Sequence, residues 1–253
     1  MIRIIKNPNL PAEKVTIALA GNMPEALYNA FLAKGISIVK LCKNTVIQSC
    51  VNSHADMLCH HLGGKDFLLS FNDIEVKNEL KKLGFEPIVI KNALESDYPK
   101  DIALNGARIM DKLICKKDKI SQEIISYCNL KDIEIINVPQ GYAKCSICIV
   151  NKNAIITEDL SIKSACEKRG IDVLLINKGF VRLNGYNYGF IGGCSGLISK
   201  NELAFFGNIK NHPDYYNIKS YLKNYNVIPV SLTSDDLIDI GGIIPLIEKG
   251  EQE

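Results

Sequence analysis

The sequence lacks several features that mark common classes of protein. It contains no uninterrupted apolar segment of about 18 residues, the length that suggests a membrane-spanning helix. Its first eight residues also lack the apolar run of a signal peptide. The formal net charge is only +2, and the lysines are spread along the chain, so there is no basic stripe for nucleic acid. We therefore expect a cytoplasmic protein that engages neither membranes nor nucleic acids.

Signatures of bound nucleotides and metals are also missing. No Gly-x-Gly-x-x-Gly follows a first strand, and the glycine-rich stretch 189–196 lacks the Gly-Lys-Ser/Thr ending of a phosphate loop. Cys145 and Cys148 form a Cys-x-x-Cys pair, but no second pair accompanies them, which argues against zinc. We expect the protein to need no metal or organic cofactor.

Cysteine is plentiful, with nine residues in the chain. An odd number without a signal peptide indicates reduced thiols, most of them small core hydrophobes. The apolar surroundings of four cysteines predict this structural role for them: Cys42, Cys115, Cys128 and Cys166. Histidine is scarce, and three of the four histidines are expected in solvated turns or loops: His60, His61 and His212.

A repeat of about 45 residues dominates the chain. Each unit contains an opening strand, a second strand, an amphipathic helix and a third strand. The opening strands are expected near 53–58, 101–104, 143–145, 190–194 and 239–244. They carry anchor residues at intervals of 45, 44, 49 and 45 positions: Asp56, Asp101, Cys145, Cys194 and Asp239.

The last unit is divided between the two ends of the chain, which would close a ring and leave no sheet edge open. The predicted fold is a single-domain α/β protein, a five-bladed α/β propeller of ββαβ repeats around a central channel. Its blades comprise roughly 236–253 plus 1–52, 53–97, 98–141, 142–187 and 188–235. Such even repetition argues against an open doubly wound sheet.

Three segments resemble motifs of the pentein superfamily, which includes arginine deiminases, amidinotransferases and dimethylarginine dimethylaminohydrolases. They are His-Ala-Asp-Met-Leu-Cys at 54–59, Gly-Tyr-Ala-Lys-Cys-Ser at 141–146, and the intervening Tyr-Pro-Lys-Asp-Ile-Ala-Leu-Asn at 98–105. Family enzymes place a histidine and a cysteine two blades apart, facing one channel. The 91 residues between His54 and Cys145 equal two units here. In those enzymes the cysteine lies near the chain end, so the resemblance implies circularly permuted blades.

The resemblance implies a cysteine-dependent hydrolase or transferase that acts on a guanidino or amidino carbon of a small cationic molecule. Cys145 would be the nucleophile and His54 would move protons. Asp239 lies near the position of the second catalytic carboxylate. Substrate contacts would come from Asp56, Asp101 and Asn105, with Cys194 as a second thiol able to face the channel. A reactive Cys145 should have a lowered pKa.

Strand periodicity adds two expectations from the residues themselves. Asp56 follows His54 by two positions, so a strand would place both side chains on one face. Cys145 and Cys148 are three apart and would face opposite sides, with Cys145 on the apolar side of Ile147.

A non-catalytic pentein that acts as a binding protein is the alternative. Without permutation, the segment 241–246 takes the nucleophile's position and offers isoleucine and proline where histidine and cysteine would stand. In addition, Tyr-Gly-Phe-Ile at 188–191 occupies the place of the acidic pair that grips the substrate.

Overall fold

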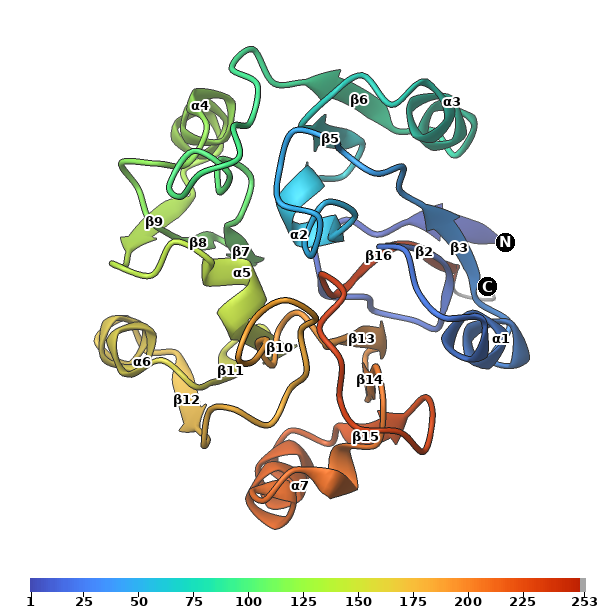
Figure 1. Cartoon of the computed structure of the whole chain (residues 1–253), viewed down its shortest axis with the longest axis vertical. Helices are drawn as coiled ribbons and strands as arrows, with labels where there is room; N and C mark the ends of the chain where they lie inside the picture. Colours follow the sequence, from blue (N-terminus) through green and yellow to red (C-terminus); the bar gives the residue numbers. More distant parts are fainter. Residues whose placement is uncertain (251–253) are drawn as a thin grey trace.

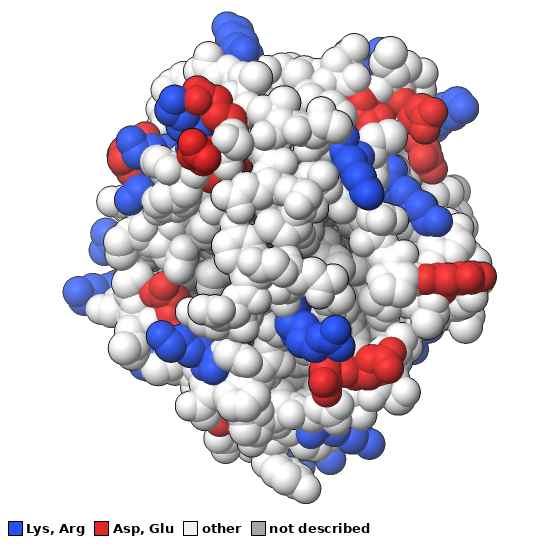
Figure 2. All heavy atoms as spheres, viewed as in Figure 1, with Lys and Arg blue, Asp and Glu red and all other residues white. Residues whose placement is uncertain are grey.

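The computed structural model describes residues 1–250, which form five small sheets. Figure 1 shows these sheets arranged around a common centre, with the longer helices on the outside. In the same view, Figure 2 shows charged residues mostly toward the periphery and mainly uncharged residues around the middle. The mixed α/β class and the five sheets agree with the prediction.

One sheet combines the two ends of the chain. Its order is β1 (Ile2–Ile4), β16 (Ile243–Lys249), β2 (Val15–Ala20) and β3 (Ser37–Lys40). The C-terminal strand β16 therefore lies between two N-terminal strands and is antiparallel to both. This pairing ties the ends of the chain together, and the sheet itself remains open at both edges.

The other four sheets have three strands each and follow one another along the chain. They are β4 (Cys59–Gly63), β5 (Asp66–Leu69) and β6 (Glu86–Val89); β7 (Ala107–Ile109), β8 (Lys112–Cys115) and β9 (Glu134–Asn137); β10 (Ile147–Asn151), β11 (Ala154–Thr157) and β12 (Asp172–Leu175); and β13 (Ser195–Ser199), β14 (Glu202–Phe205) and β15 (Ile228–Ser231). In each sheet the first two strands are antiparallel, and the third is parallel to the second. The parallel pair requires a crossover, which a helix supplies.

The crossover helices are α1 (Glu25–Ala33), α3 (Ile74–Lys82), α4 (Gln122–Leu130), α6 (Leu160–Glu167) and α7 (Tyr215–Asn224). Each buries two side chains four positions apart on one face, as an amphipathic helix does. Cys128 and Cys166 occupy one of these two positions, which confirms their predicted structural role. No helix within residues 1–250 has the length and apolar character needed to cross a membrane.

The first strand of each unit begins later in the sequence than predicted. Residues 55–58 form the one-turn helix α2 (Ala55–Leu58), residues 143–146 form α5 (Ala143–Ser146), and 101–104 and 190–194 are turns. These segments enter the centre of the molecule, where a helical turn satisfies its own backbone groups. The amides of Leu58 and Ser146, for example, donate to the carbonyls of His54 and Tyr142 at 3.1 and 3.0 Å.

The predicted burial of Cys42 and the predicted solvent exposure of three histidines are also wrong. Cys42 is exposed, whereas Cys115 is buried as expected. His60 and His61 lie within β4 and are buried, and His212 is buried beside the short 3-10 helix η1 (Ile209–Asn211). Burial lowers the pKa of His60 to about 3 and that of His61 to about 4, so both rings are neutral.

Glu248 on β16 holds the two ends of the chain together. Its buried carboxylate accepts hydrogen bonds from the amides of Ala12 and Glu13 at 2.7 and 2.9 Å, and from Arg3 Nε at 2.9 Å. We expect Glu248→Ala to lower the free energy of unfolding by about 2–3 kcal/mol, because bonds to a charged acceptor are lost. Urea denaturation measures this loss. Glu86→Ala, at an exposed position of β6, is the control, and an equal effect of both substitutions would contradict the assignment.

Candidate active site

Five connecting turns meet at the centre of the molecule. Four of them come just before the first strand of a three-stranded sheet, and the fifth comes just before β16. Hydrogen bonds join them in a closed circuit: Asp56 N to Gly241 O (3.1 Å), Gly242 N to Gly193 O (2.7 Å), Gly193 N to Cys145 O (2.9 Å), Lys144 N to Asn105 Oδ1 (2.8 Å) and Asn105 Nδ2 to Asp56 O (3.0 Å). Four of the five turns contribute backbone groups. The fifth contributes the side chain of Asn105, which therefore both accepts and donates within the circuit.

Glycine is required where these turns approach most closely. A Cβ atom on Gly193 would lie 2.0 Å from Asp239 Oδ1, and one on Gly241 would lie 2.4 Å from the amide nitrogen of Ala55. Gly241 also has a φ of 88°, which favours glycine. The Gly-Gly pairs at 192–193 and 241–242 thus allow the turns to pack tightly.

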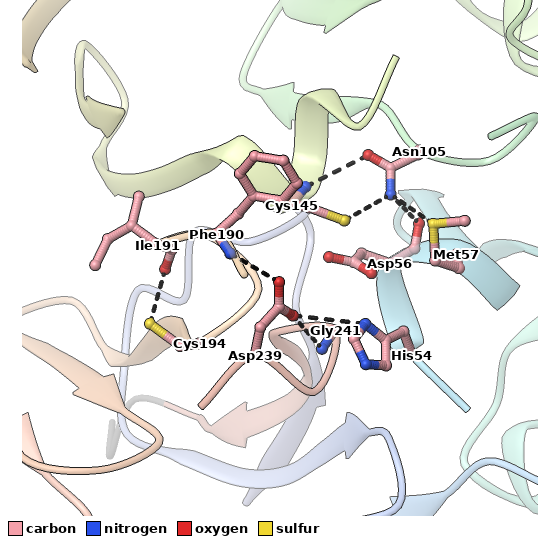
Figure 3. A network of polar contacts seen from close by, with 10 residues as sticks. All are labelled: His54, Asp56, Met57, Asn105, Cys145, Phe190, Ile191, Cys194, Asp239 and Gly241. Atoms are coloured by element: carbon pink, nitrogen blue, oxygen red, sulfur yellow. Dashed lines mark hydrogen bonds and ion pairs between the residues drawn. The ribbon is translucent and has the colours of Figure 1, made fainter. Parts of the chain in front are cut away.

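His54, Cys145 and Asp239 line one cavity of about 260 Å³. His54 Nδ1 lies 3.5 Å from Asp239 Oδ1, as Figure 3 shows. The Asp239 carboxylate also accepts hydrogen bonds from the amides of Phe190 (2.9 Å) and Gly241 (3.1 Å), which fix its orientation. Residues far apart in the sequence, from three different turns, therefore present an imidazole, a thiol and a carboxyl to one space.

The electrostatic environment keeps Cys145 protonated. Burial raises the pKa of its thiol well above the ordinary value, and the nearby carboxylates of Asp56 and Asp239 raise it further. Asn105 Nδ2 donates to Cys145 Sγ at 3.1 Å, which works in the opposite direction. The predicted lowering of this pKa is wrong for the unliganded protein. The strand-face argument for Cys145 also fails, because Cys145 belongs to helix α5.

Asp56 lies beside the cavity rather than on its surface. It is 1% exposed and is absent from the lining, and its carboxylate oxygens have no hydrogen-bond partner among residues 1–250. Figure 3 shows the carboxylate directed toward the space between Cys145 and Asp239. His54 is the N-cap of α2, so the predicted pairing of His54 with Asp56 on one strand face is wrong, and Asp239 is the carboxyl partner of His54.

The other predicted site residues do not line the cavity. Asp101 accepts a hydrogen bond from the Tyr142 hydroxyl at 2.8 Å, and Asn105 lies within the circuit of turns. The expectation that Cys194 faces the channel is wrong, because its thiol is fully buried and donates to the carbonyl of Ile191 at 3.3 Å. Cys148 is buried in the same core cluster as Cys194, whereas Cys145 belongs to another cluster.

Sequence reasoning missed two groups around the cavity. One is an aromatic wall that includes Tyr142 and Tyr186, for which the only signal was the cluster of aromatic residues at 186–190. The other is Glu158 in a neighbouring cavity that shares Tyr188 and Phe190 with the first. Burial raises the pKa of Glu158 to about 8. Within residues 1–250, no cluster of three or more His, Cys, Asp or Glu side chains is arranged to hold a metal ion.

The arrangement of five small sheets is similar to the fold of the pentein enzymes. The inosamine-phosphate amidinotransferase of Streptomyces griseus is 8% identical, with a TM-score of 0.59 over 99% of each chain. An amidinotransferase of the saxitoxin biosynthetic pathway from Microseira wollei is 9% identical, with a TM-score of 0.54 over 89% of this chain and 91% of that one. At these identities the similarity concerns the fold.

A third similar structure is the dimethylarginine dimethylaminohydrolase of Pseudomonas aeruginosa in complex with citrulline, 10% identical, with a TM-score of 0.50 over 87% of this chain and 93% of that one. No curated protein sequence matches the chain significantly. The chain belongs to the family of unknown function DUF6873, whose model matches residues 18–244.

Asn105 connects the circuit of turns to the thiol, so we expect Asn105→Asp to suppress the reactivity of Cys145. The new carboxylate retains an acceptor for Lys144 N, but it removes the donor to Sγ and to the carbonyl of Asp56 and adds negative charge. The loss at Sγ and the added charge both raise the thiol pKa. Alkylation of Cys145 by iodoacetamide at about pH 8 should slow at least about tenfold, the effect of one pKa unit.

Mass spectrometry of the Cys145 peptide measures this rate. The control is Asn137→Asp, because Asn137 Oδ1 likewise accepts from a backbone amide, that of Lys117 at 2.9 Å, but on the surface. An unchanged or faster rate in Asn105→Asp would contradict the role assigned to Asn105.

Glu158 should make stability depend on pH. Because its pKa is about 8 when folded and near 4.5 when unfolded, the folded state holds the proton more tightly. Its contribution to stability is therefore full below about pH 4.5 and is lost as the pH rises toward about 8. Relative to the wild type, Glu158→Gln should gain stability between about pH 5 and about pH 8, measured by urea denaturation. Glu25→Gln, on the exposed face of α1, is the control. A pH-independent difference for Glu158→Gln would refute this account.

Proposed function

We propose that the chain is a single-domain, five-bladed propeller in which β16 closes the ring, and that it acts in the cytoplasm as a cysteine-dependent enzyme on guanidino or amidino carbons. The placement of β16 between β1 and β2 supports the ring. The proposal for activity rests on one observation: His54, Cys145 and Asp239 line the same cavity. By their names, the structurally similar proteins include amidinotransferases and agmatine deiminases.

In the proposed reaction Cys145 gives its thiol proton to His54, and the thiolate attacks the planar guanidino carbon to form a C–S bond. The tetrahedral intermediate collapses with cleavage of a C–N bond, and His54 gives a proton to the departing amine. The product is a covalent amidino-enzyme. Water, or an acceptor amine in a transferase, then attacks the same carbon, His54 removes its proton, and the C–S bond breaks to return Cys145.

The substrate itself would ionise the thiol. A guanidinium group keeps its charge at neutral pH, and its planar donors suit a carboxylate such as Asp239. Asp56 and Asp239 raise the pKa of Cys145 in the empty site, so a bound cation that offsets their charge lowers this pKa. The thiolate therefore forms next to the carbon that it attacks.

Binding without chemistry is the second candidate, and the raised pKa of Cys145 favours it. A protonated thiol beside Asp56 is a poor nucleophile, and a pocket with buried carboxyl groups retains affinity for a cation in either case. The two functions differ in one observable, the formation of a bond to Cys145 that depends on the charge of the reagent.

Chloroacetamidine and chloroacetamide test this difference, because they have the same shape and only the amidine is cationic. We expect the amidine to alkylate Cys145 at least about tenfold faster than the amide, since one unit of thiol pKa corresponds to a tenfold change in thiolate. Asp239→Asn should reduce this ratio toward one, because the carboxylate partner of the cation is lost. Mass spectrometry of the Cys145 peptide gives both rates.

N-acetylcysteine in solution is the reference for the intrinsic reactivity of each reagent. Cys42 does not serve, because burial and the carboxylates of Asp73 and Glu75 raise its pKa, and these charges would also attract a cation. Cys148→Ser, which removes a buried thiol outside the cavity, should leave the Cys145 ratio unchanged. If the preference of Cys145 for the amidine over the amide is no greater than that of N-acetylcysteine, the proposed catalytic role of Cys145 is wrong.

A further inference from the structure

The walls of the cavity differ in character from its polar end. Apart from His54, Cys145 and Asp239, one part of the lining is aromatic and consists of Tyr142, Tyr186, Tyr188 and Phe190. The remaining lining side chains are aliphatic or neutral: Val51, Met57, Leu183 and Asn187. Among residues 1–250 the lining contains no lysine or arginine, and its one histidine, His54, is already paired with Asp239, so a ligand anion would find no free cationic partner there.

The aromatic rings are held by one another and by their hydroxyl groups. Tyr142 packs against Phe190 with ring centroids 6.3 Å apart, and Phe190 packs edge-on against Tyr188 at 6.2 Å. The Tyr142 hydroxyl is engaged by Asp101, and that of Tyr186 by Gln48. Because these two hydroxyls already donate to protein oxygens, the rings offer a ligand mainly apolar surface.

One buried cation lies close to the central turns but outside the lining of the cavity. Lys144 belongs to α5 but does not line the cavity, and its Nζ lies 3.5 Å from the position that a Cβ on Gly242 would occupy. The carboxyl of Asp239, by contrast, lines the polar end of the cavity, and that of Asp56 is buried beside it. A carboxylate on the ligand would be desolvated against aromatic carbon and repelled by like charge.

We infer that the cavity selects cations whose remaining part is short, uncharged and apolar or aromatic, and that it excludes amino-acid substrates such as free arginine. The volume of about 260 Å³ lies at the small end for ligand pockets, which limits the length of the tail. The tail contributes affinity through burial of apolar surface, and the cation contributes through Asp239 and the faces of the rings. This inference rests on the proposed function, because it assumes that the polar end receives a guanidinium-like group.

Butylguanidine and 4-guanidinobutanoate test the inference, because they share the guanidinium and differ mainly in the charge at the far end. Titration calorimetry with the Cys145→Ser protein, in which the covalent step is blocked, gives both dissociation constants. We expect butylguanidine to bind at least about tenfold more tightly, a difference of about 1.4 kcal/mol. Free arginine should bind no better than 4-guanidinobutanoate.

A variant with a new cation in the wall provides the converse test. Leu183→Arg should improve the binding of 4-guanidinobutanoate relative to butylguanidine, because it supplies the missing carboxylate partner. Asn187→Gln, a neutral change in the same wall, should leave the ratio unchanged.

The outcomes distinguish a failure of the inference about the tail from a failure of the proposed function. If the Cys145→Ser protein with Leu183 unchanged binds the two guanidines equally, or binds 4-guanidinobutanoate more tightly, the inference about the tail is wrong. The proposed function is unaffected by that result. Failure of both guanidines to bind overturns the proposed function, and the inference fails with it.

Discussion

The closed circuit of hydrogen bonds among the five central turns is the constraint on which the site depends. Each turn is held by its two neighbours, so His54, Cys145 and Asp239 are positioned by contacts that belong to other sheets. Four contributions come from the backbone and therefore tolerate different side chains. Asn105 alone contributes a side chain, and its amide also donates to Cys145 Sγ. The group that completes the circuit is thus also a contact of the candidate nucleophile.

The repeating part of the fold could be predicted from the sequence because each repeat has the same local requirements. Two apolar strands, a helix that buries residues four apart, and a reversal after the helix recur in every unit. In all five units a residue two or three positions after the end of the helix has a positive φ. These residues are Gly35, Gly84, Asp132, Gly170 and Asn226. These are short-range features, so single-sequence patterns capture them.

The central segments could not be predicted in the same way. Every residue of α2 and α5 is buried, so neither segment has a polar face from which a helical period could be read. His60 and His61 were misjudged for a related reason. Their burial comes from partners elsewhere in the chain, the carbonyl of Leu104 for one and the ring of Phe85 for the other. The predictions of which side chains share a strand face assumed strands at 53–58 and 143–145. Neither strand exists, so both predictions are wrong.

The charges around the cavity connect its structure to its function. Asp56 carries a buried carboxylate without a hydrogen-bond partner among the described residues, an arrangement that costs free energy in an empty site. Two neighbours, Cys145 and Asp239, hold their protons more tightly as a result. Burial is the first cause of the raised pKa of each, and the charge of Asp56 raises both further. A cation that enters the cavity offsets the same negative charge and lowers these pKa values. Ligand binding and proton loss are therefore linked at this site, and the step that relieves the unpaired carboxylate is the same step that prepares the thiol to react.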